Sequence, residues 1–232
     1  MCGTDNHAGN GGAPRIVRLP LTLFPPLWWY RAMAAADVAV IDAGARYDKR
    51  RKSVHRFDIA STRGLLSLTV PVSHTPAAEL VEAAAGELPD APAVSRVKLW
   101  EDVTVSSHGR WWENAAQTLA TAYGGTPWFD DLFPYFAEFF MADAVDRSIV
   151  GYALSADAVV RRLLRLPVRV TTAVTPQWQQ QVTVAEPSQF PDSPYRQVRQ
   201  DTLGFVPGLS VLDALFNLGS TDTRQLITNG SL

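Results

Sequence analysis

The stretch that decides the fold runs from Leu23 to Ile59 and reads LFPPLWWYRAMAAADVAVIDAGARYDKRRKSVHRFDI. Two prolines near its start supply a turn and the first position of a helix, where a backbone N–H would have no partner in any case. The pattern predicts a helix over residues 27–36. It then predicts a strand over residues 38–41, because a short, continuous apolar run between two aspartates is typical of a strand buried on both faces.

The segments on either side of this stretch extend the pattern. Residues 15–22 predict a short first strand that, because of Pro20, is either irregular or at an edge, so strand, helix and strand form a βαβ unit. Residues 54–59 and 65–72 predict a hairpin around a turn that contains Gly64. The other expected elements are strands over residues 97–106 and 168–174, helices over 111–123, 127–141, 155–166 and 210–219, a surface excursion over 75–92 and a loop over 176–194. We therefore predict an α/β fold, with a mixed sheet built on the N-terminal βαβ unit and helices appended toward the C-terminus.

Length and composition set the class of protein. The 232 residues are 47% apolar, which is enough to bury a core without disulfides or a metal. The only cysteine, Cys2, excludes an intramolecular disulfide and a multi-cysteine metal site. Residues 1–14 lack the apolar segment of a signal peptide and are expected to be a disordered leader, with residues 15–232 as a single domain. No apolar run reaches the roughly 18 to 20 residues of a membrane span, so we expect a cytoplasmic protein.

Positive charge is concentrated in residues 46–56, which hold six lysines and arginines and one aspartate and so carry a formal charge of +5. The whole chain carries −2, so the remaining residues sum to −7. A positive centre on an otherwise acidic chain favours a local anionic ligand, whereas a nucleic-acid-binding protein is usually basic over a whole face. We expect an anionic small-molecule substrate and no nucleic acid.

A family resemblance is carried by segments that follow one another in a fixed order over roughly residues 19–220. They are FPPLWWY (24–30), ADVAVID (36–42), YDK (47–49), HR (55–56), LTVPV (68–72), Trp111, Tyr123, TPWF (126–129), GFVP (204–207), LSVLDALFN (209–217) and Gly219. In these segments the chain resembles the WbqC-like proteins. The resemblance implies an association with bacterial surface-polysaccharide or other secondary gene clusters, and it implies no established chemistry.

The chain departs from the family pattern in two places. Relatives carry an Arg-Asn-Arg-like segment where residues 53–56 read SVHR. They also often carry a histidine four residues after the tryptophan, where Ala115 stands in this chain. If that histidine is catalytic in relatives, this chain has either lost the activity or moved the role to His55 or His108.

The basic run predicts an anion site. It follows the carboxyl end of a strand, where α/β sheets bind ligands, and the helix start at residues 25–26 lies at the same end of the βαβ unit. We expect Lys49, Arg50 and Arg56 to bind phosphate or carboxylate oxygens beside Tyr47, since the planar fork of arginine bonds two oxygens at once. The alternative is a solvated charge cluster that binds nothing.

His55 and Asp42 are the candidate catalytic residues. His55 is a candidate because imidazole titrates near neutrality and the neighbouring arginines favour its neutral, proton-accepting form. Asp42 is a candidate because it lies at the end of a predicted strand. Trp111 and Tyr123 are the other expected substrate contacts, as an aromatic wall beside the cleft, although aromatics at helical spacing also serve as core packing. Histidines do not recur at ligand spacing, so no metal site is expected. Phosphate-loop, hydrolase and dinucleotide motifs are absent, which leaves the cofactor open.

Two functions remain after these exclusions. The first is a transferase that acts on an activated or phosphorylated intermediate, such as a nucleotide-linked sugar, in O-antigen-like surface-polysaccharide or natural-product biosynthesis. The second is a non-catalytic binding or scaffold protein of such a pathway, which the alanine at position 115 favours. The sequence does not predict the oligomeric state.

Overall fold

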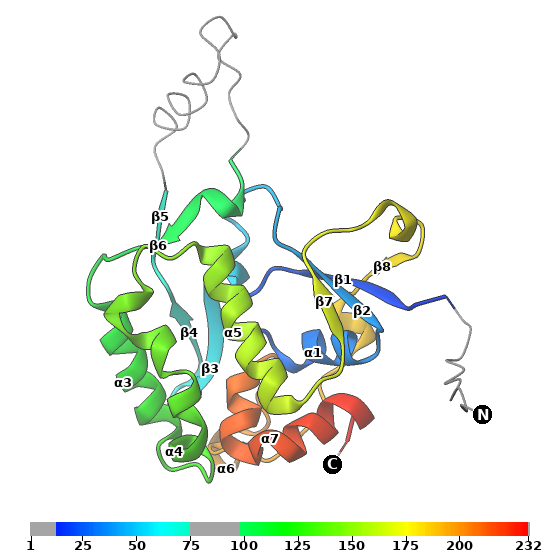
Figure 1. Cartoon of the computed structure of the whole chain (residues 1–232). Coiled ribbons are helices and arrows are strands. Elements are labelled where there is room, and N and C mark those ends of the chain that lie inside the picture. The colour runs from blue at the N-terminus through cyan, green and yellow to red at the C-terminus, as the bar shows by residue number, and fades with distance from the viewer. Residues whose placement is uncertain (1–12, 75–97, 232) are drawn as a thin grey trace, which may run out of the picture.

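The computed structural model describes residues 13–74 and 98–231 (Figure 1). The excursion expected over residues 75–92, and residues 1–12 of the expected leader, lie outside the described residues. Parallel strands, antiparallel pairs and several helices confirm the α/β fold. Among the described residues, none of the helices combines the length and apolar character that a membrane crossing requires.

The central element is a parallel sheet with the strand order β7-β2-β1-β8. Its strands are β1 (Ile16–Pro20), β2 (Val38–Asp42), β7 (Arg169–Thr171) and β8 (Val182–Val184). Helix α1 (Leu27–Ala34) connects β1 to β2 and completes the predicted βαβ unit. The first four residues of β2 are buried, as its continuous apolar run predicts.

Strand β8 lies within the segment that the sequence predicts to be a loop. It has three residues and sits at the edge of the sheet, paired with β1 alone. Val184, its last residue, is 58% exposed. A strand this short and this exposed carries too little alternation to be recognised from the sequence pattern.

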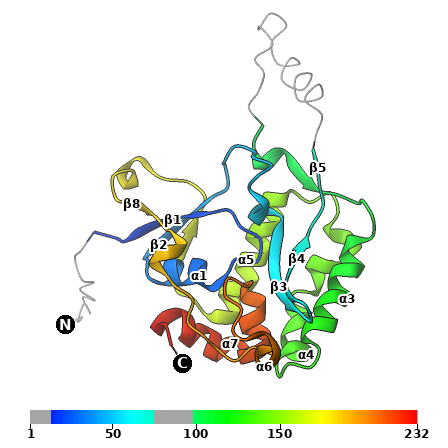
Figure 2. The same ribbon diagram turned by 180° about the vertical axis from the view of Figure 1, so that it is seen from behind.

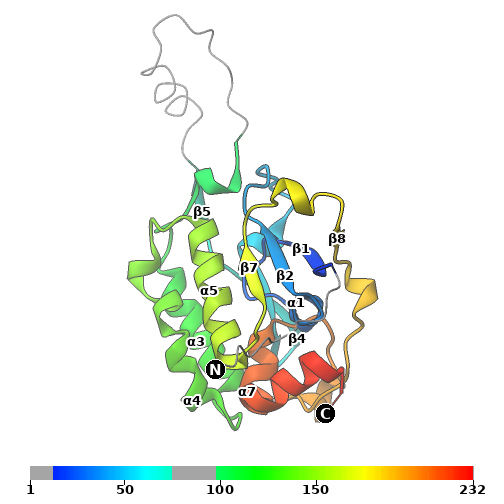
Figure 3. The ribbon, with the colours of Figure 1, turned by 45° about the vertical axis from the view of Figure 1, so that its right-hand side comes forward.

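The two faces of the parallel sheet are covered differently. Val17 and Leu19 point into the main hydrophobic core, to which α1, α5 (Ile149–Leu164) and α7 (Val211–Asn229) also contribute. Ile16 and Val40 point to the opposite face, where Trp178, from the connection between β7 and β8, makes a smaller cluster. Figure 3 shows this connection, in yellow, leaving β7 and returning to β8. One face is therefore thickly covered and the other thinly.

The predicted hairpin forms between β3 (Arg56–Ser61) and β4 (Gly64–Thr69). Gly64 adopts a φ of 102° in its turn, which a glycine tolerates readily. A second antiparallel pair joins β5 (Val72–His74) to β6 (Val103–Val105), which is the only strand within the described part of residues 97–106. Both pairs are separate from the parallel sheet, so three sheets replace the single mixed sheet that the sequence predicts. The hairpin lies beside α3 (Trp111–Tyr123), as Figure 2 shows.

Two expected helices have different bounds. Helix α5 begins at Ile149, so Ser155 lies inside it and does not cap it. The expected helix over residues 127–141 is divided into α4 (Phe129–Leu132) and short 3-10 turns over residues 133–135 and 137–140. Pro134 lies in the first of these turns, and its missing N–H prevents a continuous α-helix.

The C-terminal helix is longer than predicted. The sequence predicts that Gly219 ends it, but α7 continues to Asn229 with a kink at Gly219, where φ is 78°. A Cβ added at Gly219 would lie 2.7 Å from a ring atom of Trp128. Gly219 therefore ends the regular turns of the first helical segment, as predicted, and a second segment continues in a new direction beyond its close approach to Trp128.

Candidate functional site

The basic run lies beside the lead into α1, as expected, but most of its cations do not converge there. The Leu23 amide donates to the Ser53 carbonyl at 2.8 Å, which fixes the run against the lead. Lys49 and Arg50 are exposed, and Arg50 pairs with Asp48 at 3.3 Å with 88% of its side chain exposed. The start of α1 instead meets the start of α7, because Pro26 bridges to Ser210. No described contact joins Lys49 or Arg50 to that helix start, and their anion-binding role stays a prediction.

Arg56 makes its described contact across the hairpin. It lies at the first position of β3, and its Nε donates to the Thr69 hydroxyl on the paired strand at 2.9 Å. This cross-strand contact uses the side chain to fasten the hairpin. An anion-binding role for Arg56 stays a prediction.

Tyr47 and His55 pack around Trp100, which is buried. The Tyr47 ring meets the Trp100 ring edge-on, with centroids 4.7 Å apart, and the His55 ring lies 6.3 Å from it. The His55 Nδ1 lies 3.1 Å from the Val70 carbonyl oxygen. Since a carbonyl only accepts, Nδ1 carries the proton in this contact. The predicted catalytic role of His55 is untested.

Trp111 and Tyr123 are built into the core. Trp111 is buried, and its indole N–H donates to the Ser106 carbonyl at 2.8 Å. The Tyr123 hydroxyl accepts from the Ala60 amide at 3.1 Å and donates to a carboxylate oxygen of Asp213 at 2.9 Å. These bonds occupy the indole N–H of Trp111 and the hydroxyl of Tyr123. Both side chains therefore have the environment of core packing, which the sequence analysis gives as the alternative role.

Asp213 is the centre of a buried polar network. It has no exposed surface, and its second carboxylate oxygen accepts from the Tyr195 hydroxyl at 2.6 Å. Burial raises the pKa of Asp213, and the hydrogen bonds from Tyr195 and Tyr123 oppose that rise. The network ties α3, β3 and α7 together.

Asp42 is the predicted site residue with the most suggestive surroundings. It ends β2, and one of its carboxylate oxygens accepts from Arg18 Nη2 at 2.8 Å. Its other oxygen lies 4.0 Å from Nη1 of Arg51, the one member of the basic run with a described contact to it. Asp42 is 23% exposed in its side chain, while the two arginines are 46% and 44% exposed. The carboxylate therefore holds two guanidinium groups at the carboxyl end of the sheet.

These three residues line a cavity of about 500 Å³, which we call the edge cavity. Its other walls are the end of β1 with Pro20, the end of β8 with Glu186 and Pro187, and the half-buried ring of Trp28 from the first turn of α1. A second cavity of about 510 Å³ continues over the thinly covered sheet face and shares Arg18 and Asp42 with the first.

The position of the edge cavity follows from the order of the strands. The chain passes from β1 to β2 on one side of β1 and later returns to β8 on its other side. Such a reversal of direction leaves a crevice at the carboxyl ends of the strands, which is where open α/β sheets bind ligands. The cavity lies at that crevice.

The sequence analysis missed Arg18, Glu186 and the role of Trp28. Arg18 is the one charged residue among Ile16–Pro20, and a strand alternates its side chains, so Arg18 shares a face with Ile16. A charge in the middle of a predicted strand was a usable signal. Glu186 gave none, since it follows the unrecognised strand β8.

No group of three or more histidine, cysteine, aspartate or glutamate side chains suited to a metal ion occurs within residues 13–74 and 98–231. A scan of protein-family models, a search of curated proteins and a search of solved structures each find no match to this chain.

Proposed function

We propose that this chain binds a phosphorylated sugar intermediate, such as a nucleotide-linked sugar, in the edge cavity and acts on it as a transferase. The resemblance to the WbqC-like proteins supports a pathway of surface-polysaccharide or natural-product biosynthesis. The single observation that carries the proposal is the convergence of Arg18 and Arg51 on Asp42 inside that cavity.

The two arginines are the phosphate-binding groups. An arginine carries five N–H donors, so the bond from Arg18 Nη2 to Asp42 leaves most of its fork for a ligand. Arg51 lies within ion-pair distance of Asp42, at 4.0 Å, but beyond hydrogen-bond distance. The hydrogen bond to Asp42 orients Arg18 before the ligand arrives, which reduces the entropy lost on binding.

The carboxylates determine what else the ligand must carry. Arg18 and Arg51 together balance Asp42 and Glu186, so the four charged residues of the cavity sum to zero. A ligand that is only an anion gains little from such a cavity. A phosphorylated sugar presents phosphate oxygens to the arginines and hydroxyl donors to the carboxylates, and the flat face of Trp28 suits a sugar ring or a base.

Asp42 is the group we assign to the proton. In a transfer reaction the acceptor hydroxyl or amine must lose a proton, and a carboxylate at the cavity wall is a suitable base. The alternative function is a non-catalytic binding protein of the same pathway. The observation that favours it is Ala115, buried on α3 where relatives often carry a histidine.

The test is a titration of the protein with UDP-glucose and, separately, inorganic phosphate, followed by calorimetry and thermal shift. Replacing Arg51 by Gln is expected to weaken the binding of UDP-glucose about tenfold, the effect of losing one hydrogen bond to a charged group. Arg50→Gln is the matched control, because Arg50 belongs to the same run and is 88% exposed. Equal affinity of Arg51→Gln, Arg18→Gln and the unchanged protein would refute the site.

Turnover separates the two functions. The protein is incubated with UDP-glucose and a pool of hydroxyl and amine acceptors, and products are sought by mass spectrometry. A product that disappears in Asp42→Asn supports the transferase. Binding without a product under any acceptor supports the non-catalytic alternative.

A further inference from the structure

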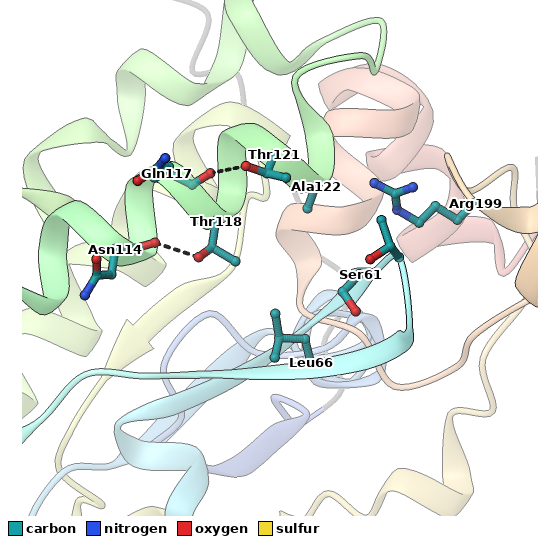
Figure 4. A pocket seen from close by; sticks show the side chains of 9 residues that line it. Ser61, Leu66, Asn114, Gln117, Thr118, Thr121, Ala122 and Arg199 are labelled. Atoms are coloured by element: carbon teal, nitrogen blue, oxygen red, sulfur yellow. Dashed lines mark hydrogen bonds between the residues drawn. The ribbon is translucent and has the colours of Figure 1, made fainter.

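A third cavity, of about 450 Å³, lies between α3 and the β3–β4 hairpin, and none of its lining residues is shared with the edge cavity. We call it the hairpin pocket. Figure 4 shows three walls: the exposed side of α3, the hairpin, and Arg199, which directs its guanidinium toward Ala122 and the turn near Ser61. Its lining residues are Ser61, Thr62, Leu66, Asn114, Gln117, Thr118, Thr121, Ala122 and Arg199.

We propose that the hairpin pocket is a binding site for a small hydroxylated oxyanion, a sugar phosphate or a sugar acid. The volume falls in the range of about 300 to 1,000 Å³ typical of small-molecule sites. Arg199 supplies the only charge among the lining residues, so no carboxylate in the lining competes with an incoming anion.

Arg199 is prepared for such an anion. Its Nε is buried and bonds to no partner among the described residues. The outer end of the guanidinium faces the pocket, where an oxyanion can accept from its N–H groups. The guanidinium fork also suits two oxygens of one phosphate or carboxylate group.

The hydroxyl groups of the pocket define the rest of the ligand. Thr118 donates to the Asn114 carbonyl at 2.6 Å, and Thr121 donates to the Gln117 carbonyl at 2.8 Å. A hydroxyl has one donor and two acceptor lone pairs, so both threonines offer lone pairs once their protons are engaged. They suit the hydroxyl donors of a sugar, and the amides of Asn114 and Gln117 add donors and acceptors of their own.

The walls of the pocket are fixed relative to one another. The Ala60 amide, next to Ser61, donates to the hydroxyl of Tyr123, which joins the hairpin to the end of α3. Gln197 fixes the segment that carries Arg199, since its side chain bonds to both the N–H and the carbonyl of Val206, at 2.8 and 2.9 Å. Preformed walls lower the entropic cost of binding.

The experiment is calorimetry on the full chain with four probes: glucose 6-phosphate, glucuronate, inorganic phosphate and glucose. The first two are expected to bind saturably, and their relative Kd values show whether phosphate or carboxylate is preferred. Glucose, which lacks the anion, is expected to bind at least about tenfold more weakly, as for a lost charge-assisted hydrogen bond.

Variants assign the binding to this pocket. Arg199→Gln is expected to raise the Kd about tenfold or more, and Thr118→Val to raise it several-fold without removing a charge. The matched control is Arg196→Gln, because Arg196 precedes the same helix α6 (Gln200–Leu203), is 76% exposed and pairs with the exposed Asp201. That control is expected to bind as the unchanged protein does.

Three outcomes would overturn the inference: no saturable binding of either hydroxylated anion, equal loss in Arg196→Gln, or an unaltered Kd in both Arg199→Gln and Thr118→Val. Arg51→Gln separates this pocket from the edge cavity. If Arg51→Gln weakens these probes and Arg199→Gln does not, the hairpin pocket is excluded while the proposed function gains support.

Discussion

The edge cavity and the hairpin pocket are similar in volume, at about 500 and 450 Å³, but they differ in whether carboxylates line the cavity beside the arginines. At the edge cavity, Arg18 and Arg51 face the carboxylate of Asp42, and Glu186 completes the balance of charge. In the hairpin pocket, Arg199 has no carboxylate among its fellow lining residues. An arginine already held by an acid selects ligands by geometry, whereas an arginine without one attracts any anion that fits.

The two sites also depend on different parts of the fold. The edge cavity is made by strand order, because β1 lies between β2 and β8. The hairpin pocket is made by side-chain bonds, since Tyr123 joins the hairpin to α3 and Asp213 holds Tyr123 from α7. The first should survive changes in the buried polar network, and the second should not.

Asp213→Ala tests this difference most severely. It leaves the hydroxyls of Tyr123 and Tyr195 buried without their acceptor, so we expect the free energy of unfolding to fall by about 3 kcal/mol. Binding at the hairpin pocket should weaken more than binding at the edge cavity. Urea denaturation measures the first effect and calorimetry the second. Asp201→Ala, in which an 82% exposed carboxylate is removed, is the control and should leave stability unchanged. Equal loss at both cavities would contradict the proposed division of the fold.

The dependence of stability on pH gives a second test of the network. Burial raises the pKa of Asp213 in the folded chain above its ordinary value of 3.8. At a pH between 3.8 and the raised pKa, the folded chain therefore holds a proton that the unfolded chain has released. The contribution of Asp213 to the free energy of unfolding is therefore largest below pH 3.8. It falls as the pH rises through the pKa that Asp213 has in the folded chain. Buried Asp157 has a raised pKa too and adds a slope of the same sign.

Asp213→Asn removes the contribution of one group. Unfolding by urea at a series of pH values should show a smaller fall in stability for Asp213→Asn than for the unchanged chain. The difference between the two proteins isolates Asp213 from Asp157 and from the surface carboxylates. Parallel pH profiles would show that the pKa of Asp213 is the same in the folded and unfolded chain, contrary to our expectation. Asp201→Asn, on the exposed partner of Arg196, should reproduce the profile of the unchanged chain.

The sequence predicted what depends on neighbouring residues. The βαβ unit was recognised because β1, α1 and β2 each carry a local pattern, and the hairpin because Gly64 marks its turn. The stop at Gly219 was recognised because glycine usually ends a helix, but the second helical segment that follows it was missed, since nothing in the local pattern shows the chain turning back into a helix beyond the contact with Trp128. The separation of the sheets was missed because pairing between distant strands leaves no local trace.

The sites follow the same rule. Asp42 was predicted because it ends a recognisable strand, but its partner Arg18 depends on the register of β1 with β2, which the sequence does not determine. Arg199 lies in a segment with no periodic pattern, and the bonds between Gln197 and Val206 that fix this segment are apparent only in the folded chain. Side chains that come from distant parts of the chain and meet only after folding cannot be identified as one site from the local sequence pattern.

Glu186→Gln sharpens the comparison of charge. Removing this carboxylate gives the edge cavity a net charge of +1, as in the hairpin pocket, and we expect UDP-glucose to bind about two- to threefold more tightly, a modest change because the group is exposed. The gain should shrink at high salt. Asp131→Asn on α4, also exposed, serves as the control for total charge. Weaker binding in Glu186→Gln would mean that the carboxylate accepts from the ligand more strongly than it repels it.

The smallest effect is expected from the double variant Lys49→Ala and Arg56→Ala, although the sequence alone assigns these residues to the anion site. Lys49 is exposed, and Arg56 donates across the hairpin to Thr69. We expect unchanged affinity for UDP-glucose and for glucose 6-phosphate, and a melting temperature close to that of the unchanged chain. Calorimetry and thermal unfolding measure these quantities, with Arg51→Gln as the positive control for loss of binding. Loss of UDP-glucose binding in the double variant would return the anion site to the basic run and remove the edge cavity from consideration, because neither substituted residue lines it.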